Sequence, residues 1–305
     1  MPATTPPAKL DQAINADNGV AEATSGSAHQ WGKLVRYEIL GQFRIVDARG
    51  SHSLNSRRLE VLLATLVIMP GRVISMDQLI DELWPNNPPR RAVASLHVYI
   101  SQLRKLLAKS GRPNSIHTRA PGYMFESSDM ETDLDEFQDL MKQGRDHIEQ
   151  EQHVAAVTCF QSALRLWRGT ALSEMREGPI VGSFGAWLDQ LRLECIEKLI
   201  ASSLKLERHG EVAPFLYSLL AEHPLHETFY QQLMTALYRS GRRAEALKVY
   251  QTARTTLRTE LGLEPCRALR ELQHSILTTE ETAGPDSLDL LMLPSSGLNA
   301  AAMHR

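Results

Sequence analysis

The sequence predicts a mostly α-helical fold with a small β component, and three observations support this prediction. Residues 33–128 combine short β-rich runs with three stretches whose apolar residues have helical spacing. Residues 129–280 are almost wholly helical in pattern and contain an internal repeat. Lys and Arg outnumber Asp and Glu by 14 to 7 in residues 33–128, whereas acids lead by 26 to 18 in residues 129–305. A basic module joined to an acidic one indicates that only the first meets a polyanion.

The composition is that of a soluble globular protein, with 43% hydrophobic and 23% charged residues in a chain of 305. This length is enough for two domains of ordinary size. No apolar run approaches the roughly 20 residues that span a bilayer, and the first 30 residues lack the features of a secretory signal. We therefore expect a cytoplasmic protein without membrane contact.

The basic module begins with a pattern typical of β-structure. The segment VRYEILGQFRIVDARG holds two β-rich runs separated by Leu40-Gly41-Gln42, which predicts a hairpin or small sheet. The next segment, NSRRLEVLLATLVIMPG, has the spacing of a helix, and Pro70-Gly71 ends it.

A second helix is predicted over SMDQLIDELW. Ser75 and Gln78 have the spacing of a capping box, and the prolines of PNNPPR end the helix. We expect Leu79, Leu83 and Trp84 to face the core.

The third helical stretch, RRAVASLHVYISQLRKLL, has two contrasting faces. One is an apolar stripe of Val93, Leu96, Ile100, Leu103 and Leu107. The opposite face carries Arg91, Ser95, Val98, Gln102 and Lys105, with His97, Ser101 and Arg104 on its flanks. Since a merely solvated face usually mixes both signs of charge, the absence of any acid here indicates a surface for a negatively charged partner.

A strand, a turn at Pro121-Gly122 and a second strand follow in SIHTRAPGYMFES. The order is therefore sheet, three helices and hairpin. This is the layout of a winged helix-turn-helix, in which the last helix enters the DNA major groove.

The acidic module resembles a stack of helical hairpins. Gly241, Ala246, Tyr250 and Ala253 occupy the same positions in LYRSGRRAEALKVYQTAR as Glu151, Ala156, Phe160 and Ala163 in IEQEQHVAAVTCFQSALR. Small residues with an aromatic four residues on are typical of tetratricopeptide repeats. A weaker third unit is expected around 191–223, with Gly210 after one helix and Pro224 after the next. The chain then divides into a disordered arm (1–32), the winged helix (33–128), the helical repeats (129–280) and a disordered tail (281–305).

Two blocks resemble the Streptomyces antibiotic regulatory protein family of transcriptional activators. The first comprises RRLEVLLATLVIMPGRVISMDQLIDELWP, ASLHVYISQLRKLL and TRAPGYMF, and the second begins AEHPLHETFYQQLMTALYRSGRRAEALKVYQTARTTLRTELGLEP and ends ALRELQHSIL. The resemblance spans about residues 35 to 280. It implies an OmpR-type winged helix followed by a bacterial transcriptional activation domain built of tetratricopeptide-like hairpins.

The resemblance also implies roles for individual residues. Base contacts are expected from the outward face of the third helix, at Arg91, Ser95, Val98, Gln102, Arg104 and Lys105. Phosphate and wing contacts are expected from Ser75, Arg90, Arg119 and Tyr123. The loop Pro85, Asn86, Asn87 and Pro88 is the expected polymerase contact.

Several of these residues have a purely structural alternative. Tyr99 and His97 can pack at the edge of the third helix, and Tyr123 can be a core aromatic residue. Arg104 and Lys105 can pair with Asp81 or Glu82 instead of DNA.

The sequence predicts no enzyme, no cofactor and no metal site. It contains no GxxxxGK[ST], HExxH or GxSxG motif, and no GxGxxG in a fitting context. His223 and His226 flank Pro224 at a helix boundary, so we do not expect them to share a helical face as metal ligands.

The function expected from these features is sequence-specific activation of a secondary-metabolite gene cluster. The resemblance implies binding to direct repeats of double-stranded DNA near the promoter −35 region by a side-by-side homodimer. It also implies recruitment of the RNA polymerase holoenzyme, including its sigma factor. Two alternatives remain at this stage: a helical-repeat interaction or sensor protein with a weak DNA-docking domain, and a repressor with the same fold.

Overall fold

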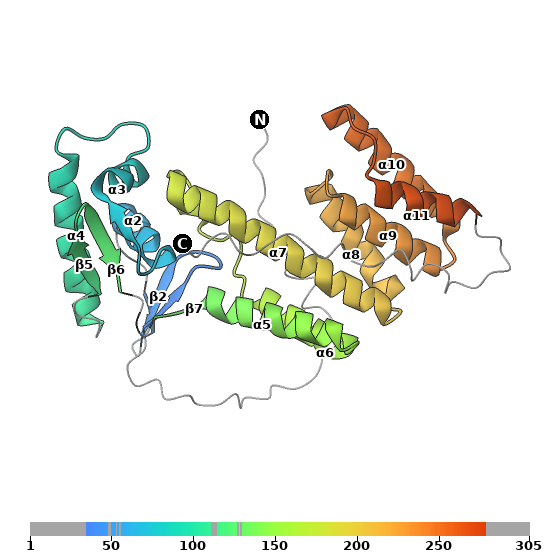
Figure 1. Ribbon diagram of the computed structural model, residues 1–305, viewed down its shortest axis with the longest axis horizontal. Coiled ribbons are helices and arrows are strands. Elements are labelled where there is room, and N and C mark those ends of the chain that lie inside the picture. Colours follow the sequence, from blue (N-terminus) through green and yellow to red (C-terminus); the bar gives the residue numbers. More distant parts are fainter. Residues whose placement is uncertain are drawn as a thin grey trace. The chain divides into compact units, whose positions relative to one another are not determined.

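The computed structural model describes residues 35–47, 50–52, 54, 56–110, 115–126, 128 and 130–278. The arms predicted to be disordered, residues 1–32 and 281–305, lie outside the described residues. Two compact units can be distinguished, Met1–Leu199 and Ile200–Arg305. Helices predominate and the strands form two small sheets, which confirms the predicted fold class (Figure 1). Among the described residues, no helix combines the length and apolar character that a bilayer span demands.

A four-stranded sheet opens the first unit, with strand order β3-β2-β1-β7. Its members are β1 (Arg36–Glu38), β2 (Arg44–Asp47), β3 (Gly50–His52) and β7 (Glu131–Thr132). β1 and β2 form the predicted antiparallel pair, with Tyr37 opposite Ile45. On its other side β1 pairs in parallel with β7, with Tyr37 opposite Thr132. The chain therefore returns to the first sheet after completing the winged helix.

The three predicted helices of the basic module are present as α2 (Arg57–Ile68), α3 (Met76–Leu83) and α4 (Ala92–Lys109). Their apolar faces pack together, and Leu62, Leu79 and Leu96 are completely buried. The predicted capping box of α3 is confirmed, because the Ser75 hydroxyl accepts from Gln78 N at 3.1 Å and Gln78 Oε1 accepts from Ser75 N at 3.0 Å.

A second sheet of order β4-β6-β5 carries the wing. It consists of β4 (Val73–Ser75), β5 (Ile116–Arg119) and β6 (Gly122–Phe125). A Cβ at Gly122 would overlap the backbone of Ile74, so β4 approaches β6 at a point where only glycine fits.

The helical region begins within the first unit as a hairpin of α5 (Asp133–Glu149) and α6 (His153–Arg165). Gly144 of α5 leaves room for the Phe160 ring of α6, since a Cβ there would overlap it. The short 3-10 helix η1 (Ser173–Met175) follows, and α7 (Pro179–Lys205) runs on toward the second unit.

The second unit contains α8 (His209–Glu222), α9 (Glu227–Arg239), α10 (Arg243–Leu261) and α11 (Arg267–Thr278). The residues predicted to make the repeat contacts are buried in both copies: Ala156, Phe160, Ala163, Ala246, Tyr250 and Ala253. The stacking that the repeat pattern predicts is thus the basis of the helical cores.

Three turns between helices, α5–α6, α7–α8 and α9–α10, share a left-handed residue, and in one of these three the residue is glycine. Gly241 has φ 76°, and the equivalent positions Glu151 and Glu207 have φ 57° and 59°. In the third unit Gly210 follows one helix, α7, and Pro224 follows the next, α8, as expected, and Gly210 lies in the first turn of α8. The chain turns three residues earlier, at Glu207, where the sequence gives no glycine signal.

One buried carboxylate joins the first sheet to the helical region. The Asp133 side chain is fully buried and accepts hydrogen bonds from Ile39 N at 2.7 Å and Leu40 N at 3.1 Å. Arg168 completes the site, since its Nη1 lies 3.0 Å from Asp133 Oδ2 and its backbone N–H donates to Leu40 O at 2.8 Å. Burial raises the pKa of Asp133, whereas the backbone donors and the Arg168 charge lower it.

We expect Asp133→Ala to lower the free energy of unfolding by about 3 kcal/mol, because two backbone N–H groups and the Arg168 guanidinium would lose their acceptor. Urea unfolding of the full chain measures this loss. The exposed Asp139 on the same helix is the control, and its change to alanine should cost less than about 0.5 kcal/mol. Equal losses for the two variants would contradict the assignment.

Candidate nucleic-acid interface

The longest helix of the winged module, α4, presents one face to the core and one to solvent. Its buried residues are Ala92, Leu96, Ile100, Leu103 and Leu107. Four of the five positions predicted for the apolar stripe are therefore confirmed. Pro88 and Pro89 precede the helix, and Arg91 is its N-cap residue.

The prediction that Val93 belongs to the core is wrong. Its side chain is 44% exposed, and Ala92, which is 8% exposed, takes the core position instead. Ala92 and Val93 both lie in the first turn of α4, on either side of the stripe, and of the two only Ala92 is buried. Val93 is thus exposed, as is Val98 on another side of the helix, which is 53% exposed.

The structure brings most of the predicted base-contacting residues together on the outward side of α4. Arg91, Val98, Gln102 and Lys105 are exposed, and Ser95 is half-buried. His97 and Ser101 are also exposed beside them. The side chains offer guanidinium and ammonium donors, an amide and a β-branched methyl group, which are groups that can read base edges in the major groove.

Arg104 differs from the other predicted base contacts because the protein already uses its guanidinium. Arg104 Nε donates to Ile116 O at 3.0 Å and Nη2 donates to the Thr118 hydroxyl at 2.9 Å. The guanidinium carbon also lies 5.9 Å from the centre of the Tyr123 ring. Arg104 therefore connects α4 to the wing, and it does not pair with Asp81 or Glu82.

The wing places its two predicted DNA contacts in different environments. Arg119 is exposed at the end of β5, opposite Gly122. Tyr123 is only 6% exposed, so its ring belongs to the core of the wing, in agreement with the structural alternative for this residue. Of these two residues, Arg119 is the one that offers an exposed cation to a phosphate.

The segment between α3 and α4 is anchored at one end and exposed along its length. Trp84 is buried, its ring stacks on Tyr99 with centroids 6.1 Å apart, and the Arg58 guanidinium carbon lies 5.5 Å from its centroid. The burial of Trp84 confirms the prediction that it faces the core, and the stacking of Tyr99 on it agrees with the structural alternative for Tyr99. After Trp84 the loop is exposed throughout, including the predicted polymerase-contact residues Pro85, Asn86, Asn87 and Pro88 and the predicted phosphate contact Arg90.

Ser75, the other predicted phosphate contact, lies at the amino end of α3. Its hydroxyl oxygen already accepts from Gln78 N, and the side chain is half-buried. The hydroxyl hydrogen can still be donated, so a phosphate contact is compatible with the capping role.

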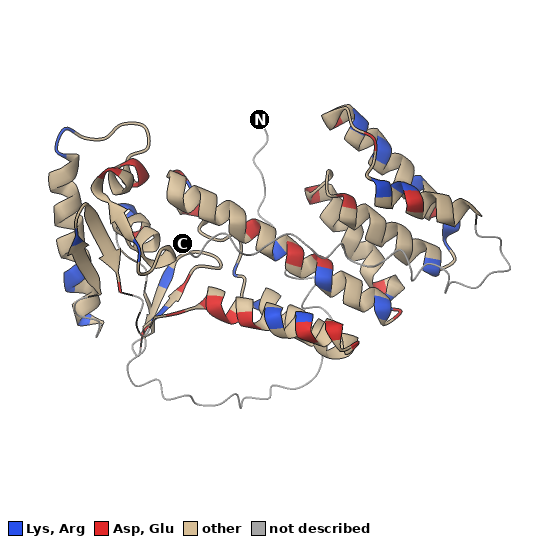
Figure 2. Ribbon diagram, in the orientation of Figure 1, with Lys and Arg blue, Asp and Glu red and all other residues tan. Residues whose placement is uncertain are grey.

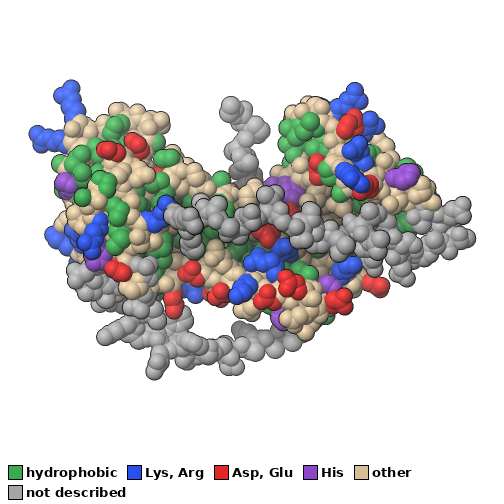
Figure 3. Space-filling view, in the orientation of Figure 1, with side chains coloured by type: hydrophobic (Ala, Val, Ile, Leu, Met, Phe, Trp, Pro, Cys, Tyr) green, Lys and Arg blue, Asp and Glu red, His purple; other side chains and the backbone are tan. Residues whose placement is uncertain are grey.

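The distribution of charge follows the expectation from the sequence. Lys and Arg occur along α4 and in the segment before it, whereas no acid occurs on α4 and acids are present on α3 (Figure 2). In the space-filling view, Lys and Arg side chains gather above and below hydrophobic side chains along the edge formed by α4 (Figure 3). A basic rim around an apolar and polar centre suits a helix that enters a DNA groove.

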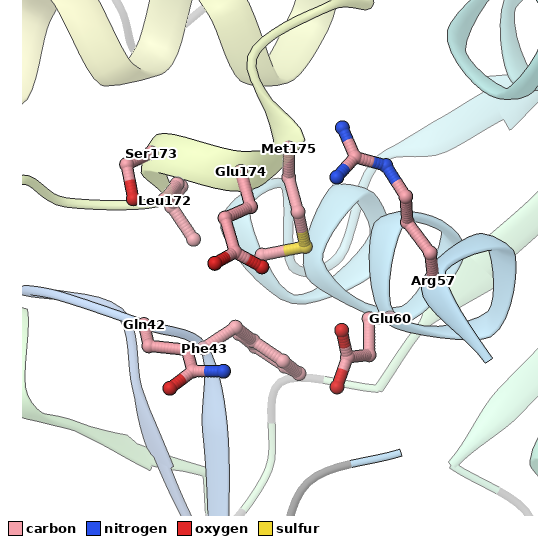
Figure 4. Close-up of a pocket in the computed structure, with 8 residues that line it drawn as sticks. All are labelled: Gln42, Phe43, Arg57, Glu60, Leu172, Ser173, Glu174 and Met175. Atoms are coloured by element: carbon pink, nitrogen blue, oxygen red, sulfur yellow. The ribbon is translucent and has the colours of Figure 1, made fainter. Parts of the chain in front are cut away.

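A small pocket lies away from α4, between the start of α2 and η1 (Figure 4). Glu60 and Glu174 face its interior, and burial together with the Glu174 charge raises the pKa of Glu60. Its volume of about 100 Å³ is below the roughly 300–1,000 Å³ of ordinary ligand pockets, so we assign it no small molecule.

Among the described residues, no group of three or more His, Cys, Asp or Glu side chains is arranged to hold a metal ion.

The sequence does not predict the role of Glu82 in the winged module, which is to cap α7. From the sequence, Glu82 is only an alternative partner for Arg104 or Lys105. In the structure it is 3% exposed and accepts hydrogen bonds from Ile180 N and Val181 N at the start of α7. A signal existed in the sequence, since Glu82 falls between the core residues Leu79 and Leu83 on the inward side of α3.

Two family models match the chain. Residues 132–277 match the bacterial transcriptional activator domain, and residues 52–125 match the C-terminal domain of transcriptional regulatory proteins. The second match contains α2, α3, α4 and the wing, and the first begins at the N-cap of α5.

Curated relatives and a solved structure agree with these matches. The chain is 35% identical to the regulatory protein DnrI of Streptomyces peucetius, over 74% of this chain and 85% of DnrI. It is 31% identical to the transcriptional regulator RedD of Streptomyces coelicolor, over 83% of this chain and 73% of RedD. The structure of Mycobacterium tuberculosis EmbR in complex with a low affinity phosphopeptide is similar with a TM-score of 0.76 and 30% identity, covering 84% of this chain and 68% of EmbR.

We expect Arg104→Ala to loosen the wing, because it removes both hydrogen bonds to β5 and the contact with the Tyr123 ring. Amide hydrogen exchange of residues 115–126 should become faster, with a loss of local stability of about 1–2 kcal/mol. Lys105→Ala is the matched control and should leave wing exchange unchanged. If neither variant alters the wing, Arg104 has no structural role there.

Proposed function

Since the chain belongs to the Streptomyces antibiotic regulatory protein family of transcriptional activators, we propose that it activates a secondary-metabolite gene cluster by binding specific promoter DNA. The exposed, acid-free face of α4 is the observation that carries this proposal. The division into a DNA-binding module (33–128) and an activation module (129–280) stays a prediction and serves as the frame of the mechanism.

In this mechanism α4 lies in the major groove. Gln102 makes a bidentate contact with adenine, and Arg91 or Lys105 reaches guanine N7 and O6. Val98 contacts a thymine methyl group. Each good bidentate pair contributes about 1–3 kcal/mol of discrimination against the wrong base.

The backbone contacts set the position of the module on the duplex. Arg90 before α4, Arg119 in the wing and Ser75 at the start of α3 contact phosphates. Such contacts carry no sequence information, but they make affinity depend steeply on salt. Arg104 holds the wing against α4, so the base contacts and the wing contacts act from a fixed relative position.

A single winged helix buries only about 600–1,000 Å² on DNA, which limits its specificity. We therefore propose that two copies bind side by side on direct repeats separated by about one helical turn, overlapping the −35 region. From this position the exposed loop Pro85–Pro88 contacts the RNA polymerase holoenzyme, including its sigma factor. Alanine substitutions in this loop should reduce activation without reducing DNA affinity.

The first test is footprinting of the purified protein on the promoters that lie next to its own gene, at two salt concentrations. An Arg91→Ala/Gln102→Ala variant is measured in parallel. The wild type should protect a direct repeat near −35. The variant should lose its preference for the repeat while it retains salt-sensitive, non-specific binding. Equally weak binding of every sequence by the wild type would reject promoter recognition and favour the alternative of a helical-repeat interaction protein. Protection that blocks transcription would favour a repressor.

A second prediction concerns the wing. Arg119→Ala should weaken binding about equally for all sequences and reduce the slope of log K against log salt by about 1, because one phosphate contact is lost. Fluorescence anisotropy with operator DNA across a salt series measures this slope. Tyr123→Phe is the control: its ring is buried, so the slope should not change. An unchanged slope for Arg119→Ala would remove it from the phosphate contacts.

A further inference from the structure

The first turn of α7 is capped by a side chain from the winged module. Pro179 occupies the first helical position and has no N–H, and the next two backbone donors have no acceptor within the helix. Glu82 Oε2 accepts from Ile180 N at 2.7 Å, and Glu82 Oε1 accepts from Val181 N at 3.0 Å. A carboxylate at this end also complements the positive end of the helix dipole.

The residue before α7 is adapted to this contact. Gly178 is buried and has no side chain that could cap the helix itself. A Cβ at this position would overlap the Glu82 carboxylate. Because residue 178 is glycine, the Glu82 carboxylate from α3 can reach the amino end of α7 and cap it.

Glu82 differs from Asp133, the other buried carboxylate that holds the helical region to the winged module. Asp133 has the Arg168 guanidinium as counter-charge. Within the described part of the chain, Glu82 forms no ion pair and depends on the two backbone donors alone. Burial raises the pKa of Glu82 against the lowering effect of these donors. The Glu82 contact therefore consists of two hydrogen bonds without a counter-charge.

The position of Glu82 connects this cap to the surfaces that the proposed function uses. It belongs to the last turn of α3, three residues before Pro85, where the exposed loop to α4 begins. The same short helix thus holds α7 on one side and leads into the predicted polymerase-contact loop on the other. A change at this cap alters the position of the amino end of α7 relative to that loop without touching the exposed face of α4.

We propose that Glu82 is a positioning residue for activation: by capping α7 it holds the amino end of this helix against α3, next to the loop that contacts RNA polymerase in the proposed function. The proposal rests on the proposed function. It assigns to Glu82 a part in activation and none in base reading.

The test uses the full chain and approaches the contact from both sides. Glu82→Ala removes the cap from α3, and Gly178→Ala displaces the carboxylate from the α7 side. Asp81→Ala, an exposed acid on the same helix, and Gly210→Ala, a helical glycine with open space around it, are the matched controls. Three quantities are measured for each variant: amide hydrogen exchange of residues 178–183, affinity for operator DNA by anisotropy, and transcription in vitro with RNA polymerase holoenzyme.

Both test variants should increase exchange at Ile180 and Val181 at least tenfold. DNA affinity should stay within twofold of the wild type, and transcription should fall at least threefold. The double variant should be no worse than either single variant, because both remove the same contact. Glu82→Gln retains one acceptor oxygen and should give an intermediate transcription level.

Unchanged transcription in variants with faster exchange overturns the positioning role. A loss of DNA affinity that equals the loss of transcription also overturns it, because Glu82 would then merely support the winged helix. Unchanged exchange in both variants overturns the cap itself. A wild type that fails to bind or activate any promoter rejects the proposed function instead, and the exchange experiment still decides whether the cap exists.

Discussion

A buried carboxylate, Asp133, is the interaction on which the first unit most depends. It lies at the start of α5, yet its carboxylate oxygens accept hydrogen bonds from backbone N–H groups between β1 and β2, almost one hundred residues earlier in the chain. Through this contact the first sheet, the loop that carries Arg168 and the first helical hairpin meet at one point. Burying a charge is costly unless every lone pair is engaged, and here two backbone donors and a guanidinium engage it. The winged helix and the start of the helical region form one compact unit as a result.

This arrangement gives the winged module two kinds of surface. The outward side of α4 and the exposed Arg119 are free for a partner, whereas the opposite sides of α2 and α3 are occupied by contacts with the rest of the unit. Arg104 is an exception on α4, because its guanidinium donates hydrogen bonds to the wing and is not free for a partner. The proposed function gives a reason why such a module is attached to stacked helical hairpins: in that proposal one part selects the promoter and the other offers area for protein contacts.

Much of this fold follows from local sequence patterns. Periodicity and the Ser75–Gln78 capping box predict the helices of the winged module, and small-aromatic-small spacing predicts the repeat contacts of α6 and α10. The patterns fail where the decisive partner is distant. Local patterns do not reveal the partners of Glu82 and Asp133, because their carboxylates accept hydrogen bonds from backbone N–H groups about one hundred residues away. Strand β7 is only two residues long and exists because β1 offers an edge. The spacing of Val93 fits the apolar stripe, but in the first turn of α4 the tertiary packing buries Ala92 and leaves Val93 exposed.

The left-handed turns have a consequence for engineering this protein. Two of the three carry glutamate, at Glu151 and Glu207, in a backbone conformation that costs an ordinary residue about 1 kcal/mol relative to glycine. Packing of the flanking helices maintains these turns, so the chain carries strain that contributes nothing to its contacts. Both positions lie outside the helix-turn-helix and the wing. Replacing Glu151 and Glu207 with glycine would relieve this strain and offers a way to raise the stability of the protein for structural and biochemical work. The exposed face of α4 and the wing would be unchanged.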